Sequence, residues 1–489
     1  MKVTVISNSI KKELTCEKGE NLLSILQKHG YRITASCGGR GVCGKCKVKV
    51  INGDFENIEN GYVLSCVAKV NSDCEIEVFE TSGGGLTYTR SSQNQIDSQQ
   101  GFGVALDIGT TTLAFSLVNL QTGEEIKTKG VLNSQGSFGA DVISRIVSSN
   151  EGNTKALQQC VLNQTREMLE LYTAECGEKI KKLYVCGNTT MLHLFLATSV
   201  EGIGKYPFIP EFVDTVRLLG KELNLPVDEV VLLPSVAAYL GADVVAGGIA
   251  CDISGANNLL VDIGTNGEML LHTNGKFYST STAAGPCFEG ANIECGTGGV
   301  AGAIDHLTIK DGKTEYTTIG DKEPVGICGA GLVDAVAEMF KGEVFDESGA
   351  FNGDEDKFYL TDKVYISQKD IRNYQLAKSA VFSGIKVLIM RSGLEYKDID
   401  KLFIAGGLGF YLNKENAVET GLLPKELKDK IEVIGNSALA GTRACMLSKK
   451  CLEFAEKLAK DTEYIDLSAD PDFMDEYILN MNFGEPFEF

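Results

Sequence analysis

The feature that most constrains the fold of this chain is a short segment that occurs twice. Leu-Asp-Ile-Gly-Thr-Thr at 106–111 returns as Val-Asp-Ile-Gly-Thr-Asn at 261–266, which places Asp107 and Asp262 155 residues apart. An apolar run with the composition of a strand precedes each copy, and another follows it, as in a strand–turn–strand unit. A near-duplicate of this kind predicts two structurally related halves that face one cleft.

Both copies place the same chemical groups at the end of a strand. The carboxylates of Asp107 and Asp262 can hold hydrated Mg²⁺, and the N–H groups and hydroxyls of the turns can cradle phosphate oxygens. The turn residues expected to do so are Thr110, Thr111 and Thr112 in the first copy and Gly264, Thr265 and Asn266 in the second. We therefore expect the two hairpins to clamp a nucleotide phosphate chain from both sides. The alternative, that both aspartates only cap turns, is disfavoured by duplication of the whole motif.

A third segment places two glycines after an apolar strand. Gly406 and Gly407 follow Phe403-Ile404-Ala405, and adjacent glycines let the backbone come close to a flat ring or a ribose. Alone, such a pair is most often a plain tight turn. In order after the two hairpins, it predicts contact with the adenosine part of an ATP-type nucleotide.

Four of the fifteen cysteines have a spacing typical of an iron–sulfur site. Cys37, Cys43, Cys46 and Cys66 stand in the pattern C-x5-C-x2-C-x19-C, and four thiolates are what a [2Fe–2S] cluster needs. The glycine-rich first loop allows backbone N–H groups to face the sulfides. A zinc site is the alternative, but structural zinc sites usually pair two short cysteine knuckles. Cys74 is the rival for the fourth ligand, although its strand-like alternation indicates packing.

Composition changes along the chain indicate several units. The first has alternating strands around one short helical stretch, which fits a β-grasp, and a stretch rich in Gly, Ser, Thr and Gln follows it as a flexible linker. The expected divisions are a cluster-binding unit at 1–80, the linker at 81–100, a first lobe at 101–255, a second lobe at 256–460 and an acidic C-terminal tail at 461–489.

Charge and hydropathy exclude several classes of partner. The net charge of −20 argues against nucleic acid, whose binding depends on Lys and Arg neutralising phosphates, and against anionic membrane surfaces. No run of about 18 apolar residues is present, so no membrane span is expected. The first residues alternate like a strand and lack the apolar core of a signal peptide. A cytoplasmic location is expected, where cysteines are metal ligands or buried thiols.

The three nucleotide segments resemble the phosphate-1, phosphate-2 and adenosine elements of the acetate and sugar kinase/Hsp70/actin (ASKHA) superfamily. Joined to the N-terminal cysteine unit, they make the chain similar to the reductive activators of corrinoid proteins. Further matching segments are 133–145, 187–191, 233–238, 284–291 and 326–332. One departure is Thr297-Gly298-Gly299, where the family often has Met-Arg after Cys295-Gly296.

The resemblance implies an α+β and α/β chain: a β-grasp [2Fe–2S] ferredoxin domain followed by a two-lobed ASKHA ATPase domain with a duplicated, RNase H-like core. It implies ATP-dependent reduction of a corrinoid protein from inactive Co(II) to Co(I) by one electron from the cluster. Cys37, Cys43, Cys46 and Cys66 would hold the cluster, while Asp107 and Asp262 would organise Mg²⁺ and the attacking water. The expected partners are a methyl-transfer corrinoid protein and a low-potential electron donor, and a homodimer stays open.

Three alternatives share the same motifs. The chain could be an ASKHA-type kinase whose cluster is only a sensor, and ATP-dependent labelling of a metabolite would favour that function. It could activate another low-potential metalloenzyme. It could also carry electrons and bind nucleotide without turnover, which an ATPase assay with and without a partner would reveal.

Overall fold

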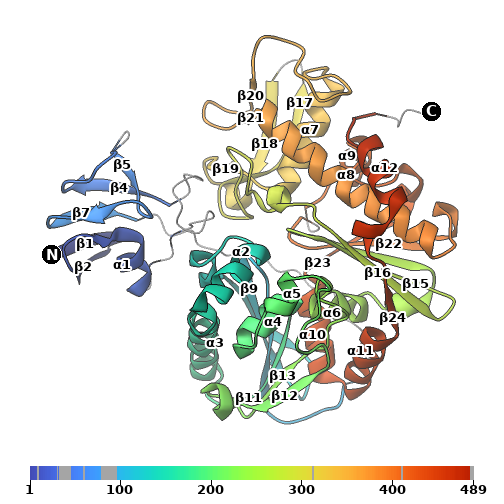
Figure 1. Ribbon diagram of the computed structural model, residues 1–489, viewed down its shortest axis with the longest axis horizontal. Coiled ribbons are helices and arrows are strands. Elements are labelled where there is room, and N and C mark those ends of the chain that lie inside the picture. The colour runs from blue at the N-terminus through green and yellow to red at the C-terminus, as the bar shows by residue number, and fades with distance from the viewer. Residues whose placement is uncertain are drawn as a thin grey trace.

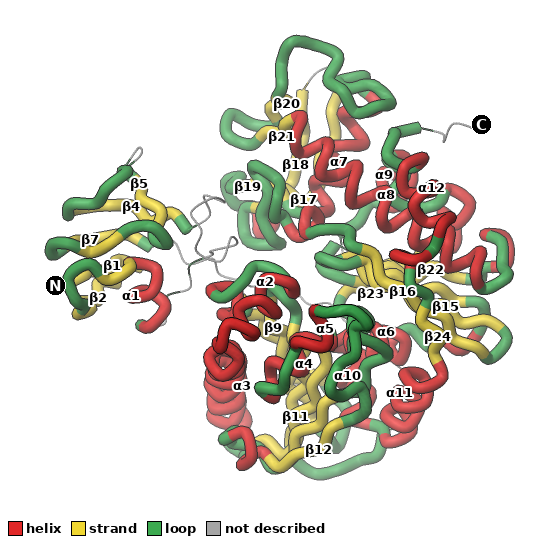
Figure 2. The backbone as a smooth tube through the Cα atoms, viewed as in Figure 1, coloured by secondary structure: helices red, strands yellow, loops and turns green. Residues whose placement is uncertain are grey.

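The computed structural model describes residues 1–7, 10–29, 31, 33, 46–58, 61–78, 96–310, 313–408 and 411–484. Figure 1 shows a small N-terminal unit and a larger body built of two lobes, and Figure 2 shows that each lobe has a sheet with helices beside it. No helix within the described ranges is both long and apolar enough to cross a membrane.

The N-terminal unit is a mixed sheet with one helix, as expected for a β-grasp. Val3 and Val5 of one strand alternate into the core, where Leu22, Ile25 and Leu26 meet them from the helix with helical spacing. The sheet has the order β2-β1-β7-β4-β5, with β1 parallel to β7. Its elements are β1 (Lys2–Ser7), β2 (Ile10–Thr15), α1 (Leu22–Lys28), β4 (Lys47–Asn52), β5 (Tyr62–Leu64) and β7 (Cys74–Glu77), beside the short pair β3 (Glu20–Asn21) and β6 (Lys69–Val70).

The first lobe has a six-stranded sheet in the order β10-β9-β8-β11-β13-β12. Its first three strands form an antiparallel meander, and β11 then returns parallel to β8. Strands β8 and β9 are buried along most of their length, which explains their nearly continuous apolar sequences. The strands are β8 (Phe102–Ile108), β9 (Thr112–Asn119), β10 (Glu125–Leu132), β11 (Ile180–Gly187), β12 (Val216–Leu219) and β13 (Glu229–Leu232).

The second lobe repeats this topology, which confirms the predicted duplication. Its sheet has the order β23-β22-β14-β15-β16-β24, in which β14, β15 and β16 form the meander and β22 is parallel to β14. The strands are β14 (Asn258–Ile263), β15 (Gly267–Thr273), β16 (Lys276–Thr282), β22 (Lys401–Ala405), β23 (Ile431–Gly435) and β24 (Thr462–Tyr464). The two Asp-Ile-Gly-Thr segments therefore occupy equivalent places, each at the turn that follows the first strand of a meander.

Two helices join the lobes. The helix α6 (Ala242–Ala250) packs closely on α10 (Ser437–Leu447), and a Cβ on Gly441 would come within 1.7 Å of the Ala246 carbonyl oxygen. α10 and α11 (Lys449–Asp461) also supply buried residues to the core of the first lobe (Figure 1). Residues 437–461, which were predicted to belong to the second lobe at 256–460, thus pack their apolar faces into the core of the first lobe.

The end of the described chain, where an acidic tail was predicted from 461, is packed as well. The buried Lys378 of α8 (Gln368–Arg391) donates to the carbonyl oxygens of Asn480 at 2.6 Å and Asn482 at 2.7 Å. Phe483 is 1% exposed. The acidic residues up to 484 thus lie among apolar anchors that hold the segment, including α12 (Pro471–Leu479), on the second lobe.

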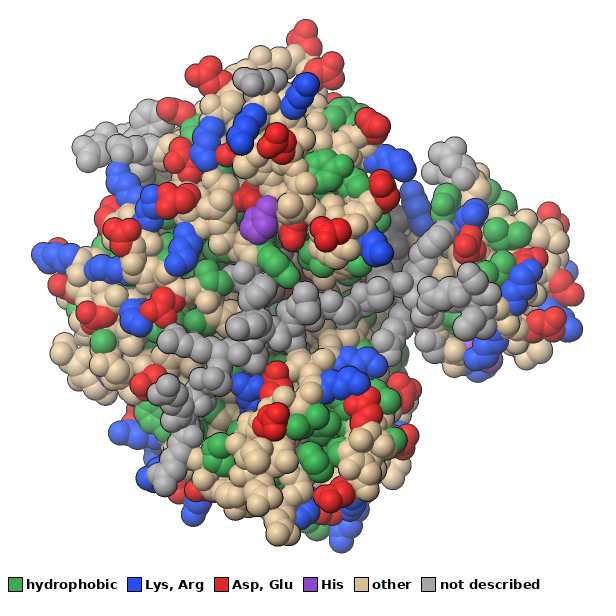
Figure 3. All heavy atoms as spheres, turned by 180° about the vertical axis from the view of Figure 1, so that it is seen from behind, with side chains coloured by type: hydrophobic (Ala, Val, Ile, Leu, Met, Phe, Trp, Pro, Cys, Tyr) green, Lys and Arg blue, Asp and Glu red, His purple; other side chains and the backbone are tan. Residues whose placement is uncertain are grey.

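The remaining elements surround the two sheets. They are α2 (Val142–Ser148), α3 (Thr154–Cys176), α4 (Thr189–Leu196), α5 (Glu201–Gly204), β17 (Ala303–Lys310), β18 (Lys313–Thr318), β19 (Gly326–Ile327), α7 (Gly329–Lys341), β20 (Lys357–Tyr359), β21 (Tyr365–Ser367) and α9 (Lys414–Glu419). On the face shown in Figure 3, acidic and basic side chains are interspersed, so the net negative charge is not gathered in one field there.

Candidate functional site

The two predicted phosphate turns meet at one carboxylate. The Thr111 hydroxyl donates to Glu289 Oε2 at 2.7 Å, and the Thr265 backbone N–H donates to Glu289 Oε1 at 2.8 Å. Gly264 lies beside the same group, since a Cβ there would be 3.1 Å from Oε1. The turns, far apart in sequence, therefore face each other as the duplication predicts.

Four carboxylates crowd the strand ends next to these turns. Asp107 and Asp262 were predicted, whereas Asp243, in the first turn of α6, and Glu268, opposite Asp262 on β15, were not. Burial is the main cause that raises the pKa of Asp107 to about 6, of Asp243 to about 7 and of Asp262 to about 8, and the neighbouring carboxylates add to the last two. The pKa of Glu268 lies well above its ordinary value for the same reasons.

Within the described ranges, no Lys or Arg is recorded against these four carboxylates, so the cluster fits a divalent cation. Glu268 Oε1 is buried and makes no hydrogen bond. In the described part of the chain, no three His, Cys, Asp or Glu side chains lie close enough to hold a metal ion by themselves. Mg²⁺ suits such a place, because it usually takes one or two carboxylates, keeps several waters and uses substrate phosphates as its other ligands.

Buried side chains hold the first turn in shape. The Arg145 guanidinium, 1% exposed, donates to the carbonyl oxygens of Thr110 and Gly139. Asn133 Nδ2 donates to the Gly109 carbonyl oxygen at 2.9 Å, and Asn188 Nδ2 donates to Thr110 Oγ1 at 3.4 Å. Burial lowers the pKa of Arg145 to about 10. Arg145 and Asn133 thus hold carbonyl oxygens of the turn, and Asn188 holds the Thr110 hydroxyl.

The other predicted turn residues close the two hairpins. The Gly109 N–H donates to the Thr112 carbonyl oxygen at 3.0 Å, and the Gly264 N–H donates to the Asn266 carbonyl oxygen at the same distance. In both copies the glycine N–H therefore closes the turn with a backbone hydrogen bond, although the first turn is one residue longer.

The glycine pair lies at the same end of the second sheet. Gly406 has a φ of +92°, and a Cβ there would be 2.5 Å from the Ile263 carbonyl oxygen and 2.7 Å from Asp262 Oδ1. A Cβ on Gly407 would meet nothing within 4 Å. Gly406 is thus required for close packing against the strand of Asp262, while Gly407 faces open space.

Two of the four predicted cluster cysteines are described, and they lie together. Cys46 and Cys66, 1% and 8% exposed, form one small buried group with Leu23. The Ser65 N–H and hydroxyl both donate to the Cys46 carbonyl oxygen at 2.9 Å. Cys37 and Cys43 lie outside the described residues. The pairing of thiols from distant segments fits a shared cluster.

Cys74 lies elsewhere, in the core of the N-terminal sheet. Burial raises the pKa of its thiol to about 11, and its side chain packs in a different cluster from Cys46 and Cys66. This placement favours Cys66 over Cys74 as the fourth ligand.

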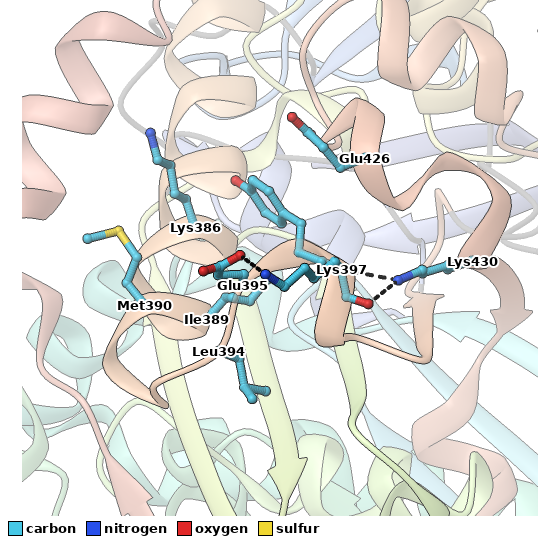
Figure 4. Close-up of a pocket in the computed structure, with 9 residues that line it drawn as sticks. Lys386, Ile389, Met390, Leu394, Glu395, Lys397, Glu426 and Lys430 are labelled. Atoms are coloured by element: carbon cyan, nitrogen blue, oxygen red, sulfur yellow. Dashed lines mark hydrogen bonds and ion pairs between the residues drawn. The ribbon is translucent and has the colours of Figure 1, made fainter.

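An open pocket of about 660 Å³ lies away from these groups (Figure 4). It lies between the end of α8 and two short helical turns, η7 (Tyr396–Asp398) and η8 (Lys425–Lys430). Lys397 pairs with Glu395 at 2.6 Å, and Lys430 donates to carbonyl oxygens of η7. None of its lining residues belongs to the carboxylate cluster, so this hollow is separate from the candidate site.

Sequence reasoning missed several groups around the two aspartates. Asn436 Nδ2 donates to Asp107 Oδ2 at 2.9 Å, and Asn436 also caps α10 by accepting from the Leu439 N–H. Asp243 stands at the start of α6, the helix that packs on α10. Extending the duplication from the hairpins to the helices that follow each parallel strand would have pointed to both positions. The exposed Gly298 and Gly299, where the sequence departs from the family, make no contact with this cluster that the structure records.

Comparisons with known proteins agree with this architecture. Residues 5–71 match the 2Fe-2S iron-sulfur cluster binding domain, residues 102–256 match the RACo middle region, and residues 256–486 match the C-terminal domain of RACo, the ASKHA domain. The first of these spans Cys46 and Cys66, and the other two divide the body near the start of β14.

Relatives extend over most of the chain. The corrinoid activation enzyme RamQ of Eubacterium limosum is 32% identical over 418 residues, which cover 78% of this chain and 70% of the relative. The [Co(II) methylated amine-specific corrinoid protein] reductase of Methanosarcina barkeri is 26% identical over 79% of this chain and 78% of its own length.

The solved structure of a reductive activator for corrinoid, iron-sulfur protein superposes with a TM-score of 0.75 at 29% identity and covers 98% of both chains. Shared domains, shared topology and identity over two thirds of a curated relative all agree. This chain belongs to the family of reductive activators of corrinoid proteins, with an N-terminal [2Fe–2S]-type domain and a two-lobed ASKHA domain.

Proposed function

We propose that this protein performs ATP-dependent reductive activation of a corrinoid protein, in which one electron from a [2Fe–2S] cluster converts inactive Co(II) to Co(I). The observation that carries the proposal is the presence on one chain of a buried Cys46–Cys66 pair in a β-grasp unit and of two facing Asp-Ile-Gly-Thr hairpins. The cysteine pair suits an electron-carrying cluster, and the two hairpins suit a nucleotide-binding site.

The cluster ligands in this proposal are Cys37, Cys43, Cys46 and Cys66. When bound, such a cluster supplies single electrons at low potential. Leu23 packs on the two described thiols and excludes water from their side. Asn21 Nδ2 donates to the Cys66 carbonyl oxygen at 2.8 Å, which fixes the backbone that presents this thiol.

The nucleotide ligands follow the hairpins. Asp107 and Asp262 would hold Mg²⁺ and orient the attacking water, and Gly406 and Gly407 would lie against the adenosine. Thr110, Thr111 and Thr112 of the first turn and Gly264, Thr265 and Asn266 of the second would contact the phosphates. Donors from both lobes converge there, so a phosphate chain would hold the two lobes together.

The coupling has a simple energetic reason. A cobalt potential 0.1–0.2 V below that of the cluster makes the transfer unfavourable by roughly 2–5 kcal/mol, at about 59 mV per 1.4 kcal/mol for one electron. A nucleotide that binds one conformation more tightly than another can supply such an amount. In this protein the conformation would be the closed arrangement of the two lobes.

The proposal also covers the cellular setting. The partner would be a methyl-transfer corrinoid protein, a low-potential donor would reload the cluster, and both would meet this protein, as monomer or homodimer, in the cytoplasm. The unit at 1–80 would carry the electron, the unit at 101–484 would bind ATP, and residues 81–100 would link them.

The test is a reconstituted reaction without oxygen. Full-length protein, a low-potential reductant and a corrinoid partner in the Co(II) state are mixed with and without Mg-ATP, and Co(I) is followed by its absorbance. Co(I) should accumulate only with Mg-ATP. Equal accumulation without nucleotide would remove the proposed role of the ASKHA domain.

A further inference from the structure

Glu289 is placed where a nucleotide phosphate would be expected. It ends the short helical turn η5 (Pro286–Glu289) of the second lobe, and its two oxygens accept from Thr111 and Thr265. We propose that the Glu289 carboxylate is an internal substitute for phosphate, which bridges the two turns until a nucleotide phosphate displaces it. The inference rests on the proposed nucleotide site and adds to it a positioning residue that sets phosphate affinity.

The donors at this bridge support the assignment. A backbone N–H in a turn and a neighbouring hydroxyl are the groups that proteins use to bind phosphate oxygens. An ionised carboxylate offers only acceptors and competes for the same hydrogens. Each of these two donors has one proton to give, so Glu289 and a phosphate cannot both hold them.

The charges around the bridge indicate which anion prevails. The Glu289 carboxylate lies within electrostatic range of Asp262, which repels it, and of the buried Arg145, which attracts it. A nucleotide arrives with Mg²⁺, which neutralises the carboxylate cluster, whereas Glu289 brings no counter-charge. The Mg-nucleotide should therefore displace Glu289 from the two donors. Its net affinity should be lower than without Glu289, because the hydrogen bonds of Glu289 must first be broken.

The bridge also joins the two lobes. Thr111 belongs to the first hairpin, and Glu289 and Thr265 belong to the second lobe. Displacement would replace one connection between the lobes by another, made through the nucleotide. Ligands that lack phosphate leave the bridge intact, so Glu289 should affect ATP and ADP but not adenosine.

The experiment measures dissociation constants by titration calorimetry on the full chain with Mg-ATP, Mg-ADP and adenosine. Glu289→Ala should bind Mg-ATP about tenfold more tightly than the wild type, equivalent to about 1.4 kcal/mol, with adenosine unchanged. Glu289→Gln, which keeps the size but loses the charge, should show a smaller gain. If Glu289→Ala does not fold, Glu289→Gln provides the test.

Glu294→Gln is the matched control. Its carboxylate accepts from the Tyr365 and Ser367 hydroxyls, away from the turns, and its removal should leave all three constants unchanged. Weaker or unaltered Mg-ATP binding in both Glu289 variants would overturn the inference, as would an equal gain for adenosine. A wild type that binds neither ATP nor ADP would instead refute the proposed function itself.

Discussion

The two lobes share a topology but differ in how they treat their aspartate. Asp107 accepts a hydrogen bond from Asn436, and Ala114 stands opposite it across the hairpin. Asp262 instead has Glu268 opposite it, and its pKa rises to about 8, against about 6 for Asp107. The two lobes thus share a backbone arrangement, while the pKa of Asp262 is raised further than that of Asp107.

The turns differ in the same way. Both turns contact Glu289, but the first is also braced by the buried Arg145 and by Asn133 and Asn188. The first turn is therefore held by several side-chain donors. The second depends more on Glu289, which we propose a nucleotide phosphate can displace. In the proposed function, the first lobe would therefore position the phosphates and the second would respond to them.

The largest expected effect comes from removing the brace of the first turn. Arg145→Met should lower the free energy of unfolding by about 3–5 kcal/mol, because it leaves buried carbonyl oxygens of Gly139 and Thr110 without donors. Urea unfolding measures this loss. Arg166→Met on α3, whose guanidinium makes exposed contacts only, is the control and should change stability by less than about 0.5 kcal/mol. Equal losses in both variants would contradict a special role for Arg145 in the first turn.

The aspartate pair should respond to pH in the absence of divalent ions. Folded-state pKa values above the ordinary carboxyl value mean that the folded protein binds more protons than the unfolded chain. Stability should therefore fall as pH rises from about 4 to about 8. Mg²⁺ should reverse most of this fall. Thermal melts at pH 6 and pH 8, with and without Mg²⁺, check the prediction, and a metal-free protein more stable at pH 8 would contradict it.

Neutralising each aspartate in turn compares the electrostatic environments of the two hairpins. Without Mg²⁺ at pH 8, Asp262→Asn should stabilise the fold by about 1–2 kcal/mol, and Asp107→Asn should do so by less, because Asp107 has the smaller shift. Both variants should lose Mg²⁺-dependent nucleotide binding. Identical stability changes would mean that the environments do not differ as described.

The smallest expected effect concerns the residue opposite each aspartate. Glu268→Gln removes the carboxyl opposite Asp262, whose own pKa is raised well above its ordinary value by burial and by Asp243 and Asp262, and should raise metal-free stability by about 1 kcal/mol at pH 8. The reverse change, Ala114→Glu, would give the first hairpin the same pair and should raise the pKa of Asp107. Carboxyl titration by NMR would measure the pKa of Asp107. An unchanged pKa would show that the residue opposite it across the hairpin has no influence.

Much of this architecture follows from local sequence. The repeated Asp-Ile-Gly-Thr segment predicted two related sheets because a strand, a turn and a returning strand are encoded within about 15 residues. The β-grasp unit followed in the same way from alternation in β1 and β7 and from helical spacing in α1. The spacing pattern assigned Cys46 and Cys66 to one site, and the two side chains lie in one small buried group.

What could not be predicted depends on contacts between distant segments. Asp243 and Asn436 carry no local motif, and they reach the site because α6 packs on α10. Glu289 lies in the family-like segment 284–291, but nothing in that segment shows that its carboxylate bridges the two turns. The residues after 461 were expected to be solvated because they are acidic, but a few apolar anchors such as Phe483 outweigh that composition.

The central claim is that nucleotide held between the two hairpins drives an electron to a corrinoid. The most direct measurement is the rate of Co(I) formation at a fixed excess of reductant, in wild type and in Asp107→Asn, each with and without Mg-ATP. Mg-ATP should raise the rate in the wild type and leave the variant at the level seen without nucleotide. A variant that reduces Co(II) as fast as the wild type, with the same dependence on Mg-ATP, would contradict the account.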